Sequence, residues 1–325
     1  MDPIIPPVDP SLLEKELSDH KFVRATNNGN NRIYIFTALD SPNLMRELGR
    51  LREITFRDAG GGTGKELDID EFDTATHPFQ QLIVWNPSDR AITGGYRFIH
   101  GEDIPCGEGG CLSSATAELF HFSPAFIHDF LPYSIELGRS FVQPEYQPTV
   151  NLKKGMYSLD NLWDGLGAII VENPDVKYFF GKMTMYPDYN KTARDIVLYF
   201  LKTYFPDLQN LMTPKVPIIP VADPDFLKNI FTGKTYEENY RILIHAVKEY
   251  NEHIPPLVNA YMNLSPTMRT FGTAINPTFG GVEETGILIN IGDIYTRKKE
   301  RHLSTYIKRL SALTGFRLRW KKSQN

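Results

Sequence analysis

Residues 133–204 alternate between strand-like and helix-like patterns, and this alternation restricts the fold more than any other feature of the sequence. Residues 133–142 and 176–185 are rich in β-branched and aromatic residues, as strands are. Residues 158–172 and 191–204 carry apolar residues at the spacing of amphipathic helices. Strands that alternate with helices pack in layers, so an α/β or α+β fold with a mixed central sheet is predicted.

The rest of the chain adds elements of both kinds. Ser41 is a suitable N-cap and Pro42 a suitable first helical residue, so a helix is expected to begin there. The elements predicted upstream are helices over 11–18, 42–58 and 123–130, and strands over 32–39, 81–85 and 91–99. Downstream, residues 206–264 are predicted to be mainly helical, and strands over 268–275 and 285–291 precede a last helix over 296–313.

The composition is that of an ordinary globular protein, with 41% hydrophobic and 23% charged residues. Apolar stretches such as Ala168-Ile169-Ile170-Val171 fall far short of the roughly 20 residues that a membrane span needs. The first residues lack the basic and apolar regions of a secretory signal, and two cysteines do not suggest a disulfide framework. We therefore expect a cytoplasmic protein, with peripheral contact to the inner membrane as an open alternative.

The net charge of −4 conceals an uneven distribution. Residues 297–325 carry ten of the 35 Lys and Arg residues but one of the 39 Asp and Glu residues, with Phe316 and Trp320 among them. Such a basic segment suits an acidic protein, an anionic membrane surface or nucleic acid, and a solvated terminal helix is the plain alternative. We predict a protein or membrane partner here and no nucleic acid.

Several common catalytic motifs are absent or incomplete. Gly60–Gly64 followed by Lys65 resembles a phosphate-binding loop, but no Ser or Thr follows the lysine, and acidic residues come next. The sequence has no Gly-x-Ser-x-Gly and no His-Glu-x-x-His motif. His100, His121 and His128 lack a regular ligand spacing, so no metal site is predicted. Cys106 and Cys111 lie in a Gly-rich loop, where an incidental role is favoured over that of a nucleophile.

Charged residues stand inside segments that are otherwise strand-like and apolar. Glu136 and Arg139 interrupt one predicted strand, and Arg97 interrupts another. A charge inside a strand is costly unless it is paired. We therefore expect Glu136 with Arg139, and Arg97 with Asp70 and Asp73, to satisfy one another in a pocket. A buried ion-pair network without chemistry is the alternative.

Four segments have a recognisable order and spacing: Arg52-x-x-x-Phe56, residues 66–73 (Glu-Leu-Asp-Ile-Asp-Glu-Phe-Asp), Gly94-Gly95-Tyr96-Arg97, and residues 135–142 (Ile-Glu-Leu-Gly-Arg-Ser-Phe-Val). They resemble the motif series of acyl-homoserine-lactone synthases. They resemble more closely that of the ornithine-acyl carrier protein N-acyltransferases of the GNAT superfamily, often labelled "hemolysin". The second resemblance continues through residues 162–167, 178–181, 188–189, 255–257 and 279–286, and so covers roughly residues 30–295. Larger N-acyltransferases that acylate glycine or ornithine are its most similar members.

The resemblance implies a GNAT-like sheet that splays between strands 133–142 and 176–185 and admits a thioester arm. The division that we predict is an N-terminal lead over residues 1–30, an acyltransferase domain over 31–296 with a helical insertion over 206–264, and a basic C-terminal helix and tail over 297–325. The Arg/Gln-x-x-Gly-x-Gly/Ala loop of ordinary GNAT enzymes is missing between Val142 and Ser158. The expected donor is therefore the acyl-phosphopantetheine thioester of acyl carrier protein, a co-substrate, with no permanently bound cofactor.

The chemistry of amine acylation suggests roles for some of these residues. An amine must lose a proton before it attacks a thioester, and Glu136 is the candidate general base. The oxyanion needs a backbone N–H donor, which we expect just after Glu136, where Gly138 permits a bulge. The resemblance assigns the acceptor pocket to Arg52, Phe56, Asp70, Asp73, Arg97 and Arg139. The candidates for an acyl tunnel are Phe98, Phe141, Phe179 and Phe180, although phenylalanines at strand positions are more often core.

These features predict an enzyme that transfers a long, 3-hydroxylated acyl chain from acyl carrier protein to the α-amine of a small amino acid, glycine or ornithine, in amino-acid lipid synthesis. The side chains expected to dock acyl carrier protein are Lys153, Lys154, Lys298 and Lys299. Those expected on anionic lipid are Arg317, Arg319, Lys321 and Lys322. Two alternatives stay open: an acyl-homoserine-lactone synthase that uses S-adenosylmethionine, and a non-enzymatic, membrane-active protein of the hemolysin type.

Overall fold

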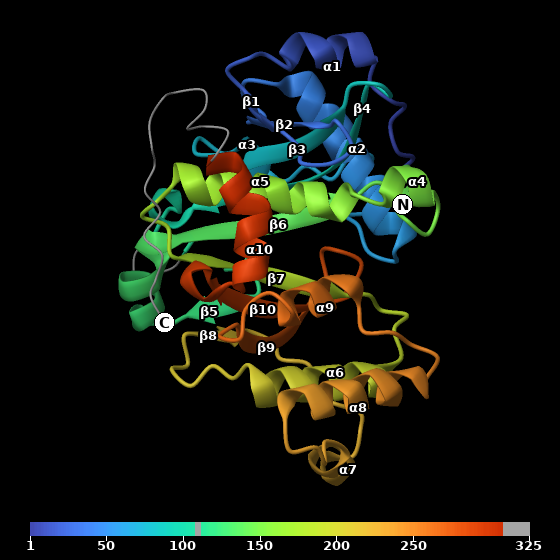
Figure 1. The fold of residues 1–325 in the computed structure, drawn as a ribbon, viewed down its shortest axis with the longest axis vertical. Coiled ribbons are helices and arrows are strands. Elements are labelled where there is room, and N and C mark those ends of the chain that lie inside the picture. Colours follow the sequence, from blue (N-terminus) through green and yellow to red (C-terminus); the bar gives the residue numbers. More distant parts are fainter. Residues whose placement is uncertain (108–111, 308–325) are drawn as a thin grey trace.

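An eight-stranded sheet runs through the centre of the molecule in the computed structural model, which describes residues 1–107 and 112–307 (Figure 1). Its strand order is β1-β2-β3-β4-β6-β7-β10-β9. The strands are β1 (Phe22–Ala25), β2 (Arg32–Phe36), β3 (Gln80–Asn86), β4 (Ala91–His100), β6 (Ser134–Val142), β7 (Tyr178–Met185), β9 (Arg269–Asn276) and β10 (Val282–Asn290). Neighbouring strands are antiparallel, except that β6 and β7 are parallel. The predicted mixed α/β sheet is confirmed.

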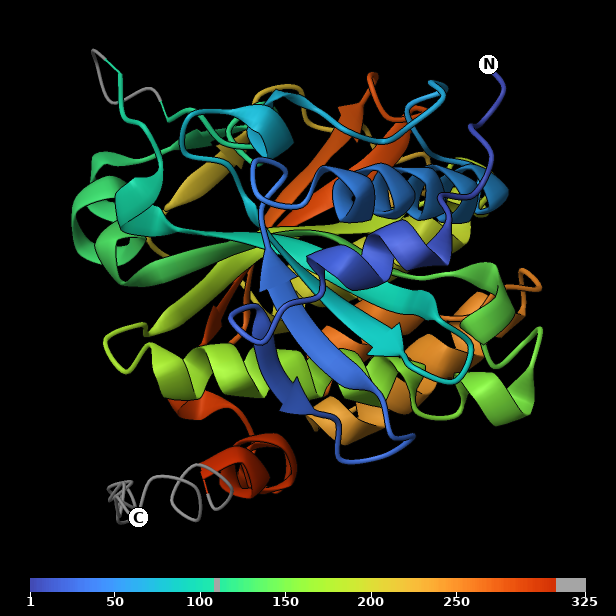
Figure 2. The ribbon, with the colours of Figure 1, turned by 90° about the horizontal axis from the view of Figure 1, so that it is seen from above.

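Helices cover both faces of this sheet (Figure 2). The elements on one face are α1 (Pro10–Glu16), α2 (Pro42–Asp58), α3 (Glu71–Thr74) and the two-stranded sheet of β5 (Phe120–Phe122) and β8 (Met212–Pro214). Those on the other face are α5 (Ser158–Glu172), α6 (Lys191–Tyr204), α8 (Tyr236–Lys248) and α9 (Pro256–Met262). The remaining helices are α4 (Leu152–Gly155), α7 (Pro224–Ile230) and α10 (Thr296–Lys299). Within the described ranges, no helix combines the length and the apolar character that crossing a membrane requires.

The three long helices that were predicted over residues 42–58, 158–172 and 191–204 have those bounds in the structure. Pro42 opens α2, where its fixed φ and missing N–H cost nothing. Asn190 caps α6 by accepting the N–H groups of Thr192 and Ala193. The local signals therefore determined where these helices begin.

Four shorter elements differ from the prediction. The predicted N-terminal lead is part of the sheet, because β1 pairs with β2; at four residues, β1 is too short to show a clear alternation. The helix predicted over 123–130 is a π-helical turn over Phe126–Phe130, followed by a 3₁₀ turn that contains Pro132. The mainly helical segment 206–264 also contains β8. After α10 the chain forms a π-helical turn over Glu300–Ser304, and residues 308–313 of the predicted last helix lie outside the described residues.

β6 and β7 separate part of the way along the sheet. They are paired with each other over four residues, from Ser134–Tyr178 to Leu137–Gly181. Beyond that point both continue as strands, but no longer pair with each other. On its other edge β6 holds one extra residue, because Arg97 of β4 pairs with Gly138 whereas Gly95 pairs with Phe141. The predicted splay is present. A bulge is present too, and it lies just after Gly138, where Arg139 has a φ of 51°.

Gly181, at the point where these strands separate, is predicted to be a position where a side chain lowers the stability of the fold. A Cβ there would lie 2.3 Å from the carbonyl oxygen of Leu137, so the strands would have to move apart. We expect Gly181→Ala to lower the free energy of unfolding by about 1–3 kcal/mol in urea denaturation. Gly138→Ala is the matched control, because its Cβ would meet nothing closer than Arg97 Nε at 3.6 Å. An equal loss in both variants would contradict the explanation.

Candidate active site

The bulge in β6 determines which side chains share the face of the sheet under α2 and α3. Side chains alternate between faces along a regular strand, so Arg139 would point away from Glu136. The extra residue resets this alternation, and Arg139 contacts Asp68 and Asp70 on the same face as Arg97. Phe141 also lies on this face, packed against Phe56 of α2.

A buried network of charges lies beneath this face. Asp73 is fully buried between two arginines, at 3.1 Å from Arg52 and 3.1 Å from Arg97. Gln81 of β3 donates to the same carboxylate at 2.9 Å and accepts from Arg52. Each buried charge has an opposite charge beside it, so the predicted pairing of Arg97 with Asp73 is confirmed.

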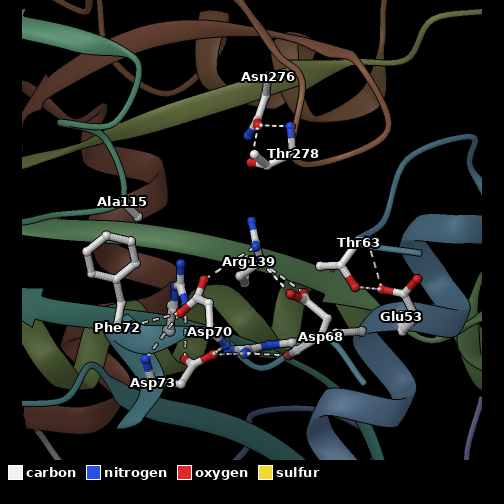
Figure 3. A network of polar contacts seen from close by, with 12 residues as sticks. Glu53, Thr63, Asp68, Asp70, Phe72, Asp73, Ala115, Arg139, Asn276 and Thr278 are labelled. Carbon is white, nitrogen blue, oxygen red and sulfur yellow. Dashed lines mark hydrogen bonds and ion pairs between the residues drawn. The ribbon is translucent and has the colours of Figure 1, made fainter. Parts of the chain in front are cut away.

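Asp70 and Arg139 form the more exposed part of this network (Figure 3). Asp70 caps α3 by accepting the N–H groups of Phe72 and Asp73, and Arg97 donates to it at 2.6 Å. Arg139 reaches Asp68 at 2.9 Å and Asp70 at 3.5 Å. Asp68 is fully buried and was missed by the sequence prediction, although it lies in the same acidic segment. Arginines hold the carboxylates, and no group of potential metal ligands was found within the described ranges.

The network shifts the acidities of its members. Burial alone would raise the pKa of Asp70, but Arg97, together with Arg139 and Arg52, outweighs burial and holds this pKa well below its usual range. Asp68 shows the opposite balance, because burial raises its pKa although Arg139 and Arg52 oppose the rise. Asp70 is thus an anion at neutral pH, paired with Arg97 and Arg139.

Glu136 lies outside this network, which corrects the prediction that it pairs with Arg139. Its carboxylate is buried and its Oε1 accepts the N–H and the Oγ1 of Thr116, each at 2.7 Å. The other oxygen, Oε2, is buried without a hydrogen-bond partner among the described residues. Burial raises the pKa of Glu136, against the opposing effects of Thr116, Ser114 and Lys182. Thr116 could not be foreseen, because it comes from a loop without a motif.

The Gly-rich loop is unsuited to binding phosphate, as the sequence indicated. The carboxylate of Glu53 accepts the N–H groups of Thr63 and Gly64, at 2.9 Å each, and the hydroxyl of Thr63. The backbone donors that a phosphate would need are therefore occupied by a buried anion.

The four candidate tunnel phenylalanines are not brought together. Phe98 and Phe179 belong to the core under α5 and α6, whereas Phe180 packs with Phe126 and Phe141 with Phe56 on the other face. Phe179 and Phe180 are consecutive in a strand, so they must face opposite ways. Of the four, Phe141 lies on the part of β6 that has separated from β7.

The candidate docking lysines occupy two places. Lys153 is exposed on α4, while Lys154 pairs with Asp89 at 2.9 Å. Lys298 lines a small pocket beside Trp163, and Lys299 donates to the carbonyl oxygen of Gly292. The residues expected on lipid, Arg317, Arg319, Lys321 and Lys322, lie outside the described residues.

Asp73 is predicted to be the residue on which this network depends most. Asp73→Ala leaves Arg52 and Arg97 buried without their shared partner, so we expect a loss of about 3–5 kcal/mol in the free energy of unfolding. The control Asp225→Ala removes a well-exposed ion pair with Lys228 and should change stability little. An Asp73→Ala/Arg97→Ala double-mutant cycle without coupling would refute the pairing.

The chain is similar to one family model and to two solved structures. A family model described as "Acetyltransferase (GNAT) domain" matches residues 51–154. Among solved structures, a CoA-dependent acyl-homoserine lactone synthase, BjaI, aligns with 86% of this chain and 90% of its own at 10% identity, with TM-scores of 0.35 with S-adenosylmethionine and isopentyl-CoA and 0.36 with MTA.

Two curated relatives are much more similar in sequence. The glycine N(alpha)-acyltransferase of Bacteroides thetaiotaomicron is 55% identical over 94% of this chain and 91% of its own length. That of Phocaeicola vulgatus is 53% identical over 95% of this chain and 94% of its own. The hemolysin-like, non-enzymatic alternative is therefore wrong. The chain belongs to the family of these glycine N(alpha)-acyltransferases within the GNAT superfamily, and it is an acyltransferase.

Proposed function

We propose that this enzyme transfers a long acyl chain from the thioester of acyl carrier protein to the α-amine of glycine, as a step in amino-acid lipid synthesis. The observation that carries the choice of glycine is the identity of more than half of all aligned residues with two enzymes named for that activity. The same relatives favour this reaction over the acyl-homoserine-lactone synthesis that the motifs left open.

Arg139 suits the carboxylate of glycine. Its Nε and Nη2 are held by Asp68 and Asp70, and its guanidinium lies 4.1 Å from the centre of the Phe279 ring. Figure 3 shows the free end of Arg139 directed toward the turn that carries Asn276 and Thr278. An arginine fixed by two anions and a ring is pre-organised to bind a further carboxylate.

Glu136 suits the role of general base. Its Oε2 is buried and lacks a partner, so an acceptor amine or a water molecule would satisfy it. Because its pKa is raised, it holds a proton more readily than an exposed glutamate does. The ammonium of glycine gives one proton to Glu136, directly or through water, and the neutral nitrogen attacks the thioester carbonyl.

The separated part of β6 suits the oxyanion. Beyond Leu137 the N–H groups of β6 that point toward β7 have no partner strand there. One of them, next to the bulge at Arg139, would donate to the oxygen of the tetrahedral intermediate. When the intermediate collapses, the C–N bond stays and the C–S bond breaks. The nitrogen releases its second proton, the pantetheine thiolate takes up one proton, and the other passes to solvent.

The segment between β6 and α5 supports a carrier-protein donor. A CoA pyrophosphate would need free backbone N–H groups here. Instead Tyr146, Gln147 and Asn151 donate theirs to carbonyl oxygens of the same segment. Incubation with glycine and ornithine together, and with either palmitoyl acyl carrier protein or palmitoyl-CoA, tests donor and acceptor in one experiment when the products are read by mass spectrometry. N-palmitoylglycine from the carrier protein is expected; a product with ornithine alone, or from CoA alone, would refute the proposal.

Glu136→Gln is predicted to lower kcat by about 10²–10⁴, because the amide cannot take a proton from the amine. Thr116 can still donate to the amide oxygen, so the melting temperature should change little. In the unchanged enzyme, kcat/KM should fall as the pH drops through the raised pKa of Glu136. A wild-type rate in the variant would show that another group is the base.

Lys153→Glu is predicted to raise the KM for acyl carrier protein several-fold with little change in kcat. Acyl carrier proteins are acidic, and Lys153 is exposed on α4, at the end of β6 where the strands separate. Lys228→Glu on α7 is the control, because that lysine is equally exposed and belongs to the distant α6–α8 layer. If both charge reversals raised the KM for acyl carrier protein equally, the carrier protein would not dock specifically at α4.

A further inference from the structure

A lysine in the interior of β7 belongs to the same face as Glu136. Lys182 follows Gly181, the last residue of β7 that pairs with β6, and its side chain is 11% exposed. Its Nζ forms an ion pair with Glu284 of β10 at 2.9 Å. It also donates a hydrogen bond to the carbonyl oxygen of Ala115 at 2.7 Å. The bond to Ala115 reaches the segment that holds Glu136.

These contacts form a continuous chain toward Glu136. Asn276 donates to Glu284 at 3.2 Å, Glu284 pairs with Lys182, and Lys182 holds the carbonyl of Ala115. The next residue, Thr116, gives its N–H and its hydroxyl to Oε1 of Glu136. The side chains of three neighbouring strands, β6, β7 and β10, are thereby linked through one short loop segment.

We propose that Lys182 is a positioning residue for the acyl transfer: it fixes the Ala115–Thr116 segment so that Thr116 holds one oxygen of Glu136 and leaves the other to face the acceptor amine. This rests on the proposed function, in which Glu136 is the general base. If Lys182 served stability alone, its ion pair with Glu284 would be sufficient, and its hydrogen bond to Ala115 would have no function.

The charge of Lys182 acts on Glu136 as well. Burial raises the pKa of Glu136, and Lys182 opposes the rise. Two charged groups from neighbouring strands face the Ala115–Thr116 segment, Lys182 of β7 and Glu284 of β10. Glu118 follows this segment in the chain, and the charges of Asp70, Glu71 and Arg139 act on it. Without the lysine charge the pKa of Glu136 should rise further, so the acidic limb of kcat/KM should move to higher pH.

The test compares Lys182→Met, Glu136→Gln and the double variant, with palmitoyl acyl carrier protein and glycine as substrates. We expect Lys182→Met to lower kcat by about 10- to 100-fold, as a misplaced catalytic group does, and to shift the acidic limb upward. Combined with Glu136→Gln it should cause little further loss, because residues that act as a unit are not additive.

Two further variants separate positioning from folding. Lys191→Met removes a more exposed ion pair of α6, 3.0 Å from Glu283, the residue next to Glu284, and should keep the wild-type kcat and pH profile. If Lys182→Met fails to fold because Glu284 is left unpaired, Lys182→Met/Glu284→Gln removes both charges. This double variant still lacks the hydrogen bond from Lys182 to Ala115, so it should show the same loss of kcat as we expect for Lys182→Met.

The outcomes distinguish this proposal from the one on which it rests. If Glu136→Gln keeps the wild-type rate, the base is misassigned and both proposals fail. If Glu136→Gln loses its rate but Lys182→Met keeps the wild-type kcat and pH profile, only the role of Lys182 is overturned. Fully additive losses in the double variant overturn it as well, because Lys182 would then act by a separate route.

Discussion

The buried pairing of Arg97 in β4 with Asp73 in α3 is the interaction on which the rest of this site depends. Both side chains are at most 1% exposed, so neither charge can be compensated by water. Asp73 also holds Arg52 of α2, and Arg97 also holds Asp70, the cap of α3. Through these two residues a helix, a short turn of helix and a central strand are held in one arrangement. Arg139 joins the more exposed side of the network, where Asp68 and Asp70 determine its position.

The bulge in β6 brings Arg139 into this network. A single inserted residue turns Arg139 onto the face of Arg97, and it lies where β6 has just lost its pairing with β7. The same irregularity therefore brings a cation and unpaired backbone donors to one short stretch of strand. Glu136 lies before the bulge, where the pairing on both sides is intact, and its carboxylate is held by Thr116 rather than by the arginines.

Much of this arrangement was predictable from the sequence, and the errors have physical causes. Charges inside strand-like runs identified Arg97, Glu136 and Arg139, because such charges require partners. The prediction that Glu136 pairs with Arg139 was wrong because it assumed contact between neighbours along one strand. In the structure Arg139 pairs with Asp68 and Glu136 accepts from Thr116, and both partners lie outside that strand. Thr116 and Lys182 could not be assigned, because the loop over Ala115 and Thr116 has no motif and meets Glu136 of β6 and Lys182 of β7 only in the folded chain. The phenylalanines were grouped by proximity in sequence, although alternation sends Phe179 and Phe180 to different cores.

The parallel contact of β6 with β7 also has a mechanical consequence. It joins two antiparallel halves of the sheet, β1-β2-β3-β4-β6 and β7-β10-β9, through four residue pairs, fewer than the eight that join β10 to β7. This seam thus has the fewest residue pairs along the middle of the sheet, and Glu136 lies within it, opposite Phe180. Amide exchange should therefore reach the edge of the seam at Leu137 before it reaches the centre of either half.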